Sequence, residues 1–101
     1  MVEQVRIGGV DVAVIEDDGV EGFGEWREAA YEIRVRPGLA PQVLAATLLH
    51  EVIHALGDAF GVSLPEKTVR TLEHGLLCAV RADPEGAKAW LSSVIEEEVD
   101  P

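Results

Sequence analysis

Apolar and polar positions alternate over short stretches in the first third of the chain, a pattern typical of β-strands. Four stretches show this pattern or a run of β-branched residues: residues 5–7, 10–15, 20–26 and 31–35. The pair Gly8-Gly9 between the first two favours a two-residue hairpin turn. We therefore expect a small antiparallel sheet of three or four strands over about residues 2–36.

After Pro37-Gly38 the apolar positions recur with a helical period, and three helices are predicted. Their expected ranges are about residues 41–56, 64–81 and 84–98. Gly57 is suited to end the first helix, and Asp83 to cap the third. Ser63 and Glu66 have the spacing of a capping box at the start of the second. A sheet followed by helices predicts an α+β fold in which the sheet packs on three helices, as one domain over residues 1–101.

Composition limits the function classes. The chain has 101 residues, of which 48% are hydrophobic, enough for one packed domain. Nineteen acidic against eight basic residues give a net charge of -11, which disfavours binding to nucleic acid or to an anionic membrane. The single cysteine, Cys78, excludes an internal disulfide, and we expect it to be a small buried residue. No secretory leader or long apolar stretch is evident, so a cytoplasmic protein is expected.

The first predicted helix carries the sequence His-Glu-Val-Ile-His at residues 50–54. Histidines four residues apart project from one helix face and can bind a single zinc ion. Glu51 can then act as the general base towards a metal-activated water. The alternative is a structural cluster without metal. Because these polar side chains are surrounded by apolar residues, they are costly to bury without a metal, and the zinc interpretation is favoured.

A third zinc ligand must come from elsewhere in the chain, and the candidates are Asp58, Glu66, Glu73 and His74. Glu66 is explained by the capping box, and Asp58 is placed to accept a hydrogen bond from a histidine. Glu73 lies within an apolar stripe of the second helix, whereas His74 shares its line with Arg70. A carboxylate in such a stripe needs a counter-charge, so Glu73 is the preferred ligand.

These two segments, Leu48–Leu56 and Leu72–Leu76, resemble the gluzincin class of zinc metallopeptidases in its minimal, single-domain form. They are also similar to small metallopeptidase-like proteins of bacteriophages and prophages. The resemblance implies zinc bound by His50, His54 and Glu73, with Glu51 as the base. It also implies a zincin-like sheet above the two motif helices, whose outermost strand binds a peptide by strand addition. The strand at residues 31–35 is the candidate for that edge.

The expected function is that of a zinc-dependent metallopeptidase acting on a peptide or protein substrate. The alternative is a latent or non-catalytic zinc-binding module that interacts with a protein partner. Larger thermolysin-like enzymes carry a second lobe that stabilises the oxyanion, and here His74, Tyr31 or Arg70 are the candidates for that role. The acidic tail at residues 96–100 is a candidate for occupying the zinc site, and association into a homodimer is compatible with the sequence.

Overall fold

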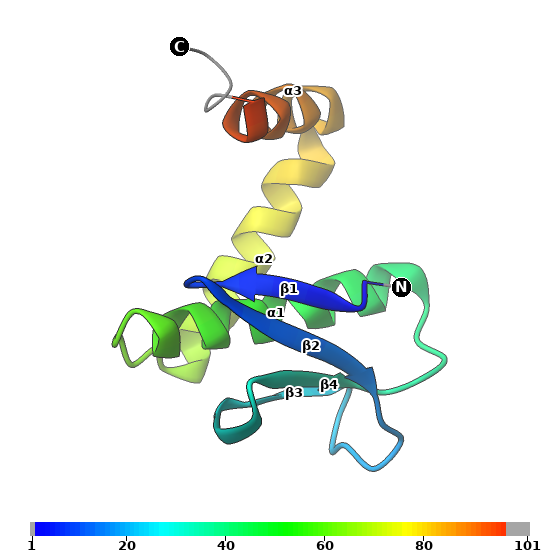
Figure 1. The fold of residues 1–101 in the computed structure, drawn as a ribbon. Helices are drawn as coiled ribbons and strands as arrows, with labels where there is room; N and C mark the ends of the chain where they lie inside the picture. The colour runs from blue at the N-terminus through cyan, green and yellow to red at the C-terminus, as the bar shows by residue number, and fades with distance from the viewer. Residues whose placement is uncertain (1, 97–101) are drawn as a thin grey trace.

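The computed structural model describes residues 2–96, and its elements follow the expected order of strands and then helices (Figure 1). The elements are β1 (Gln4–Ile7), β2 (Val10–Glu16), β3 (Gly24–Arg27), the 3-10 turn η1 (Glu28–Ala30), β4 (Glu32–Val35), α1 (Pro41–Ala59), α2 (Glu66–Ala82) and α3 (Pro84–Glu96). The α+β prediction is confirmed. The proposed role of the acidic tail concerns residues that, beyond Glu96, lie outside the described part of the chain.

The four strands form one sheet in the order β1-β2-β4-β3. β1 and β2 are an antiparallel hairpin, and its turn residues Gly8 and Gly9 have φ values of 58° and 80°, as the sequence predicts. β4, however, runs parallel to β2, with Ala13 opposite Glu32, and antiparallel to β3. The prediction of a purely antiparallel sheet is therefore wrong, and the sheet is mixed. Along the chain, β3 comes first and lies at the edge of the sheet. The chain then turns through η1, and β4 lies between β3 and β2.

This order also changes which strand is outermost. β4 lies inside the sheet, between β2 and β3, and its residues Ile33 and Val35 have no exposed surface. The prediction that residues 31–35 form the edge is therefore wrong. Two inward-facing apolar residues on a four-residue strand are best buried in the middle of a sheet. The edge strands are β1 and β3, and the residues of β3 are all half-buried.

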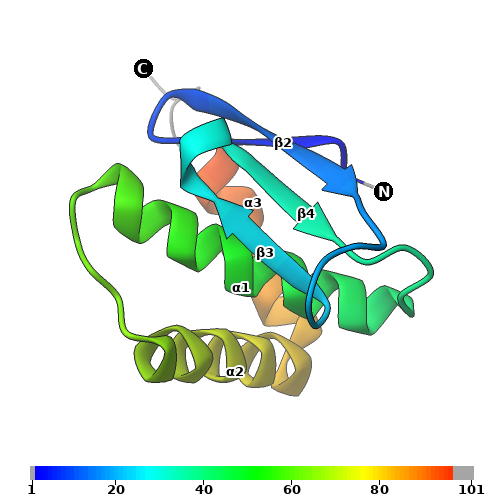
Figure 2. The same cartoon turned by 90° about the horizontal axis from the view of Figure 1, so that it is seen from below.

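Helix α1 covers one face of the sheet and lies between it and the first half of α2 (Figure 2). The core between sheet and helix is formed by small branched and aliphatic side chains: Ile7, Val12, Val14, Ile33, Val35 and Ala55. α1 continues past Gly57 to Ala59, so the prediction that Gly57 ends the helix is wrong. A Cβ atom on Gly57 would lie 2.8 Å from the Val62 carbonyl oxygen. The glycine therefore permits the close return of the chain from α1 towards α2.

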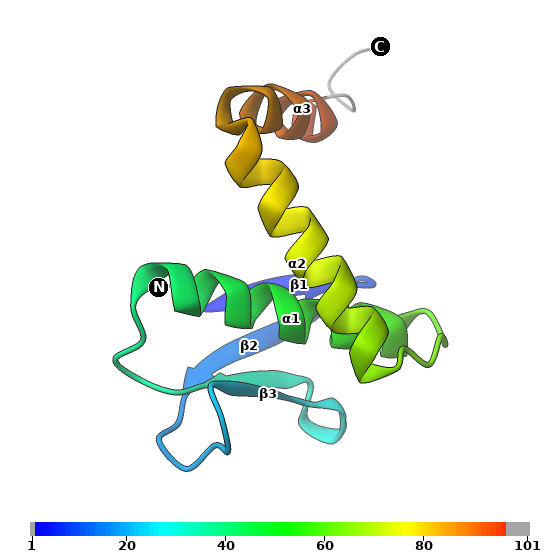
Figure 3. The same cartoon turned by 180° about the vertical axis from the view of Figure 1, so that it is seen from behind.

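Helix α2 begins at Glu66 with Pro65 as its N-cap residue, and no side chain caps it. The predicted capping box of Ser63 and Glu66 is therefore wrong, which leaves the Glu66 carboxylate free for another contact. α2 crosses α1 at a steep angle and rises away from it, with α3 lying across its far end (Figures 1 and 3). Asp83 Oδ1 accepts the Gly86 N–H at 3.0 Å, which confirms the predicted cap of α3.

Among residues 2–96, no helix combines the length and the apolar character that crossing a membrane requires.

Candidate metal centre

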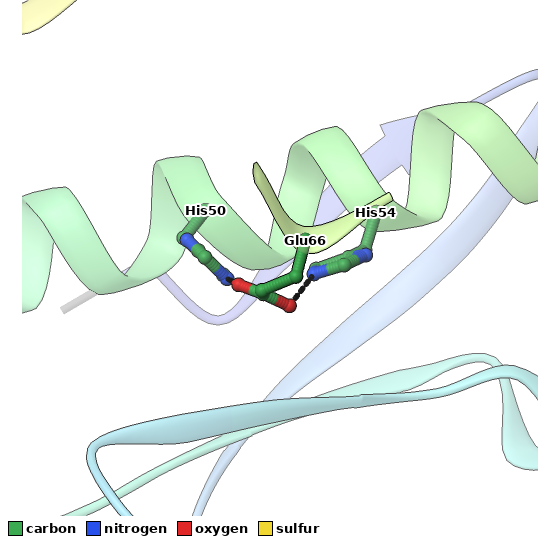
Figure 4. Close-up of side chains that lie close together, drawn as sticks. All are labelled: His50, His54 and Glu66. Atoms are coloured by element: carbon green, nitrogen blue, oxygen red, sulfur yellow. Dashed lines mark hydrogen bonds and ion pairs between the residues drawn. The ribbon is translucent and has the colours of Figure 1, made fainter. Parts of the chain in front are cut away.

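Three side chains from α1 and α2 meet in one group that could hold a metal ion: His50, His54 and Glu66 (Figure 4). The two histidines lie one turn apart on α1 and present their Nε2 atoms in the same direction. The Glu66 carboxylate lies across both, with Oε1 2.6 Å from His50 Nε2 and Oε2 3.1 Å from His54 Nε2. One ligand atom from each residue lies within 4.8 Å of the other two.

Glu73 approaches His50 from the opposite side, with Oε1 2.7 Å from Nδ1. Both ring nitrogens of His50 therefore face carboxylate oxygens. A neutral imidazole carries one N–H and can donate to only one of these carboxylates, so the other nitrogen needs a second proton or a cation. A metal ion at Nε2, with Nδ1–H donating to Glu73, satisfies both contacts. The donor set of two imidazoles and a carboxylate, with a hydrogen-bonded outer carboxylate, could hold a metal ion.

The group is accessible from solvent without being fully exposed. The His50 and His54 side chains keep 19% and 25% of their exposed surface, whereas Glu66 keeps 49%. Partial burial acts to raise the pKa of Glu66, but the charges of His50, His54 and Arg70 and a hydrogen bond with His54 together outweigh it, so the net shift is downward. Glu66 is therefore held as a carboxylate, the form that binds a metal.

Glu51 lies beside this group on α1 but is much less accessible, with 8% of its surface exposed. Burial raises the pKa of Glu51, and it outweighs the opposing effects of His50, His54 and the Trp26 backbone amide. All other charged residues among residues 2–96 are more exposed. A raised carboxyl pKa brings the group closer to the range in which a general base is effective at neutral pH.

A cleft of about 600 Å³ runs between the start of β3, α1 and α2, and both His50 and Glu51 line it. β3 approaches α1 very closely here, since a Cβ atom on Gly24 would lie 2.6 Å from Thr47 Cγ2. β3 pairs only with β4 among the described strands, so its other edge is free to bind an extended segment.

The remaining candidates from the sequence lie elsewhere. Asp58 Oδ2 accepts the Trp26 Nε1–H at 2.6 Å. The prediction that Asp58 accepts a hydrogen bond from a histidine is therefore wrong. His74 is exposed, with Nε2 3.6 Å from Cys78 Sγ. Cys78 is itself exposed, and the prediction of a buried cysteine is wrong. Tyr31 is exposed and adopts a left-handed backbone conformation with φ 50°.

Of the three candidates for oxyanion stabilisation, Arg70 alone lines the cleft. Its Nε lies 3.5 Å from Glu66 Oε1. Arg70 therefore adds a positive charge next to the group formed by His50, His54 and Glu66.

Glu66 is a candidate ligand from the sequence, but its spacing from Ser63 accounts for it as part of a capping box. No other signal in the sequence points to Glu66. In an antiparallel helix pair, Glu73 would lie opposite the histidines. Because α2 crosses α1 steeply, its first turn reaches the Nε2 atoms instead (Figure 3). The choice of Glu73 as zinc ligand stays a prediction, and its carboxylate lies on Nδ1 of His50.

Comparison of the chain with protein-family models, with curated proteins and with solved structures gave no match.

Proposed function

We propose that the protein is a zinc-dependent peptidase in which His50, His54 and Glu66 bind the metal. The observation that supports this most directly is the convergence of both Nε2 atoms on one carboxylate, beside the buried Glu51. In this proposal Glu73 fixes the ring of His50 through Nδ1 and is not itself a ligand. The ligand set therefore differs by one residue from the set that the resemblance to gluzincins implies.

Bound zinc would supply a Lewis acid that lowers the pKa of water and polarises a carbonyl group. Glu51 would take the proton from the attacking water and transfer it to the leaving amine. Its raised pKa suits both steps, since the carboxylate must accept a proton and then release it. Arg70 is the candidate for stabilising negative charge on the carbonyl oxygen, because it lines the same cleft.

The substrate in this proposal is an extended peptide segment that pairs with the free edge of β3. Phe23 and Gly24 line the cleft at this edge. Phe23 also accepts the Arg36 N–H at 2.7 Å, so its carbonyl is already used on the β4 side. Because hydrogen bonding alternates along an antiparallel strand, the polar backbone groups of Gly24 point to the free edge. Strand addition there would bring the peptide over Glu51.

The test compares wild-type protein with Glu51→Gln, which keeps the size of the side chain but cannot act as a base. Zinc content is measured by atomic emission, and cleavage is measured on unfolded casein. We expect both proteins to hold zinc and only the wild type to cleave, with a loss of at least about 100-fold in the variant. Glu28→Gln, which removes an exposed carboxylate outside this cleft, is the matched control and should cleave like the wild type.

The outcomes separate the candidate functions. If both wild type and Glu51→Gln hold zinc and neither cleaves, the peptidase proposal fails and the non-catalytic zinc module is favoured. If the wild type binds no zinc at micromolar concentrations, both proposals fail.

A further inference from the structure

A second cavity lies at the end of the sheet where the β1–β2 turn, η1 and the last turn of α1 come together (Figure 2). Its volume is about 260 Å³, and it shares no lining residue with the cleft beside His50. The buried side chains of Ile7, Val12 and Ala55 line it and make its inner surface aliphatic. We call this cavity the β-end pocket. Because it is smaller than most small-molecule sites, it suits a single side chain or a compact ligand.

Two aromatic residues also line the β-end pocket. Trp26 donates its Nε1–H to Asp58 Oδ2 at 2.6 Å, and this bond lies in the plane of the indole, so it does not use the faces of the ring. Tyr31 is 55% exposed and has a left-handed backbone with φ 50°, which a bulky residue seldom adopts. Backbone strain of this kind is concentrated at ligand-binding and active sites. Tyr31 therefore marks the pocket as a candidate binding site.

The charge of the β-end pocket indicates which ligand fits. Its charged lining side chains are acidic, and no lysine or arginine lines it. Among residues 2–96, Asp58 makes no ion pair, and its Oδ1 has no hydrogen-bond partner. The nearest arginines in the sequence contact other carboxylates, since Arg27 lies 2.7 Å from Glu25 and Arg6 lies 3.8 Å from Asp11. A carboxylate without a cation, beside aromatic rings and an aliphatic surface, suits a cation on an apolar stem.

We propose that the β-end pocket binds an ammonium or guanidinium group carried on a short aliphatic stem. The stem lies against Val12 and its aliphatic neighbours, and the cationic head lies between Asp58 Oδ1 and the ring of Tyr31. Free organic amines and the basic side chains of peptides both carry such a group. The inference does not rest on the proposed function, because no residue of the pocket belongs to the proposed zinc site.

The test follows the indole N–H signals of Trp26 and Trp90 by NMR spectroscopy while n-butylammonium is added. Trp26 lines the pocket, whereas Trp90 lies on α3 and serves as the internal control. We expect a saturable shift of the Trp26 signal alone, with a Kd of about 1 mM for a ligand of this size. n-Butanol and n-butyrate, which lack the positive charge, should bind at least about 10-fold more weakly.

Three variants test the assigned contacts. Asp58→Asn keeps an oxygen that accepts the Trp26 Nε1–H but removes the charge, and should weaken binding by at least about 10-fold. Asp18→Asn is the matched control, because it makes the same change in net charge at an exposed site outside the pocket, and it should bind like the wild type. Tyr31→Leu should weaken binding by about 2–5-fold through loss of the ring. Far-UV circular dichroism identifies a variant that fails to fold.

The source of the cation is distinguished by titrating acetyl-glycyl-lysyl-glycine amide, with norleucine in place of lysine as its control. Tighter binding of the lysine peptide than of n-butylammonium assigns the pocket to a peptide side chain, and equal or weaker binding assigns it to a free amine. The Kd should be the same with zinc and with EDTA. A Trp26 signal that does not saturate, an unchanged Kd in Asp58→Asn, or a Kd that depends on zinc would overturn the proposal. Failure to bind zinc would overturn the proposed function alone.

Discussion

Glu73 Oε1 lies 2.7 Å from His50 Nδ1, on the side of the imidazole opposite to Glu66. This relationship predicts different losses for the two carboxylates. Glu73→Ala, which removes the acceptor for His50 Nδ1–H, should weaken zinc binding by about 10–100-fold, the usual effect of losing an outer partner of a ligating histidine. Glu66→Ala should weaken it more, because the proposed ligand is lost. A competition titration with a chromogenic chelator measures both, and the reverse order would make Glu73 the ligand.

Zinc should also stabilise the fold. A metal that binds only the folded chain adds about 2.7 kcal/mol to the free energy of unfolding at a concentration 100 times its Kd. Thermal melts with zinc and with EDTA measure the effect as a shift in Tm. His54→Ala should abolish the shift, whereas His74→Ala should retain it, because His74 lies near Cys78 and outside the metal group.

The approach of β3 to α1 leaves no space for a side chain at Gly24. Gly24→Ala should lower the free energy of unfolding by about 1–3 kcal/mol, since its Cβ would lie 2.6 Å from Thr47 Cγ2 and 3.1 Å from the Arg34 carbonyl oxygen. Gly75→Ala is the matched control. Nothing lies within 4 Å of a Cβ there, and the change should stabilise α2 by up to about 1 kcal/mol. Urea denaturation measures both, and equal effects would contradict the close approach.

The loop after β2 predicts a dependence of stability on pH. Hydrogen bonds from the Gly19 N–H and from Arg34 lower the pKa of Asp17 below its ordinary value of 3.8. A carboxyl group with a lowered pKa stabilises the fold above its ordinary pKa and loses this effect as pH falls through its folded pKa. Wild type should therefore exceed Asp17→Asn in stability at neutral pH, and the gap should close in acid.

Denaturation midpoints at a series of pH values test this expectation. Asp18→Asn, which removes the exposed neighbouring charge, should show no such closing gap. A difference between wild type and Asp17→Asn that stays constant down to pH 2 would contradict the assigned cause.

The strands and helices themselves could be predicted from local patterns, but their arrangement could not. Gly8-Gly9 specifies its hairpin because the turn needs two positive φ angles, and Asp83 specifies the start of α3 through a local hydrogen bond. The insertion of β4 between β2 and β3 depends on contacts between distant residues, such as Ala13 with Glu32. Periodicity within one strand carries no information about such a neighbour.

The same limit applies to the candidate metal centre. His50 and His54 are brought together by one helix, so their spacing alone predicts their geometry. Glu66 reaches them only because α2 crosses α1 steeply, and the crossing angle depends on packing between side chains of both helices. Glu73 was recognisable as an inward-facing carboxylate, and the structure shows it half-buried against His50. The contact of the Glu73 carboxylate with His50 Nδ1 could not be deduced from the apolar stripe on the second helix.

The parallel pairing of β2 with β4 has a consequence for the order of folding. β1 and β2 can form their hairpin locally, as can β3 and β4, but the two hairpins join only through contacts between distant parts of the chain. Closing such loops is slow relative to local turns and helices. We therefore expect the joining of β2 to β4 to be a late step. Until it occurs, β3 has no fixed position over α1, and the wall of the cleft is missing from any partly folded chain.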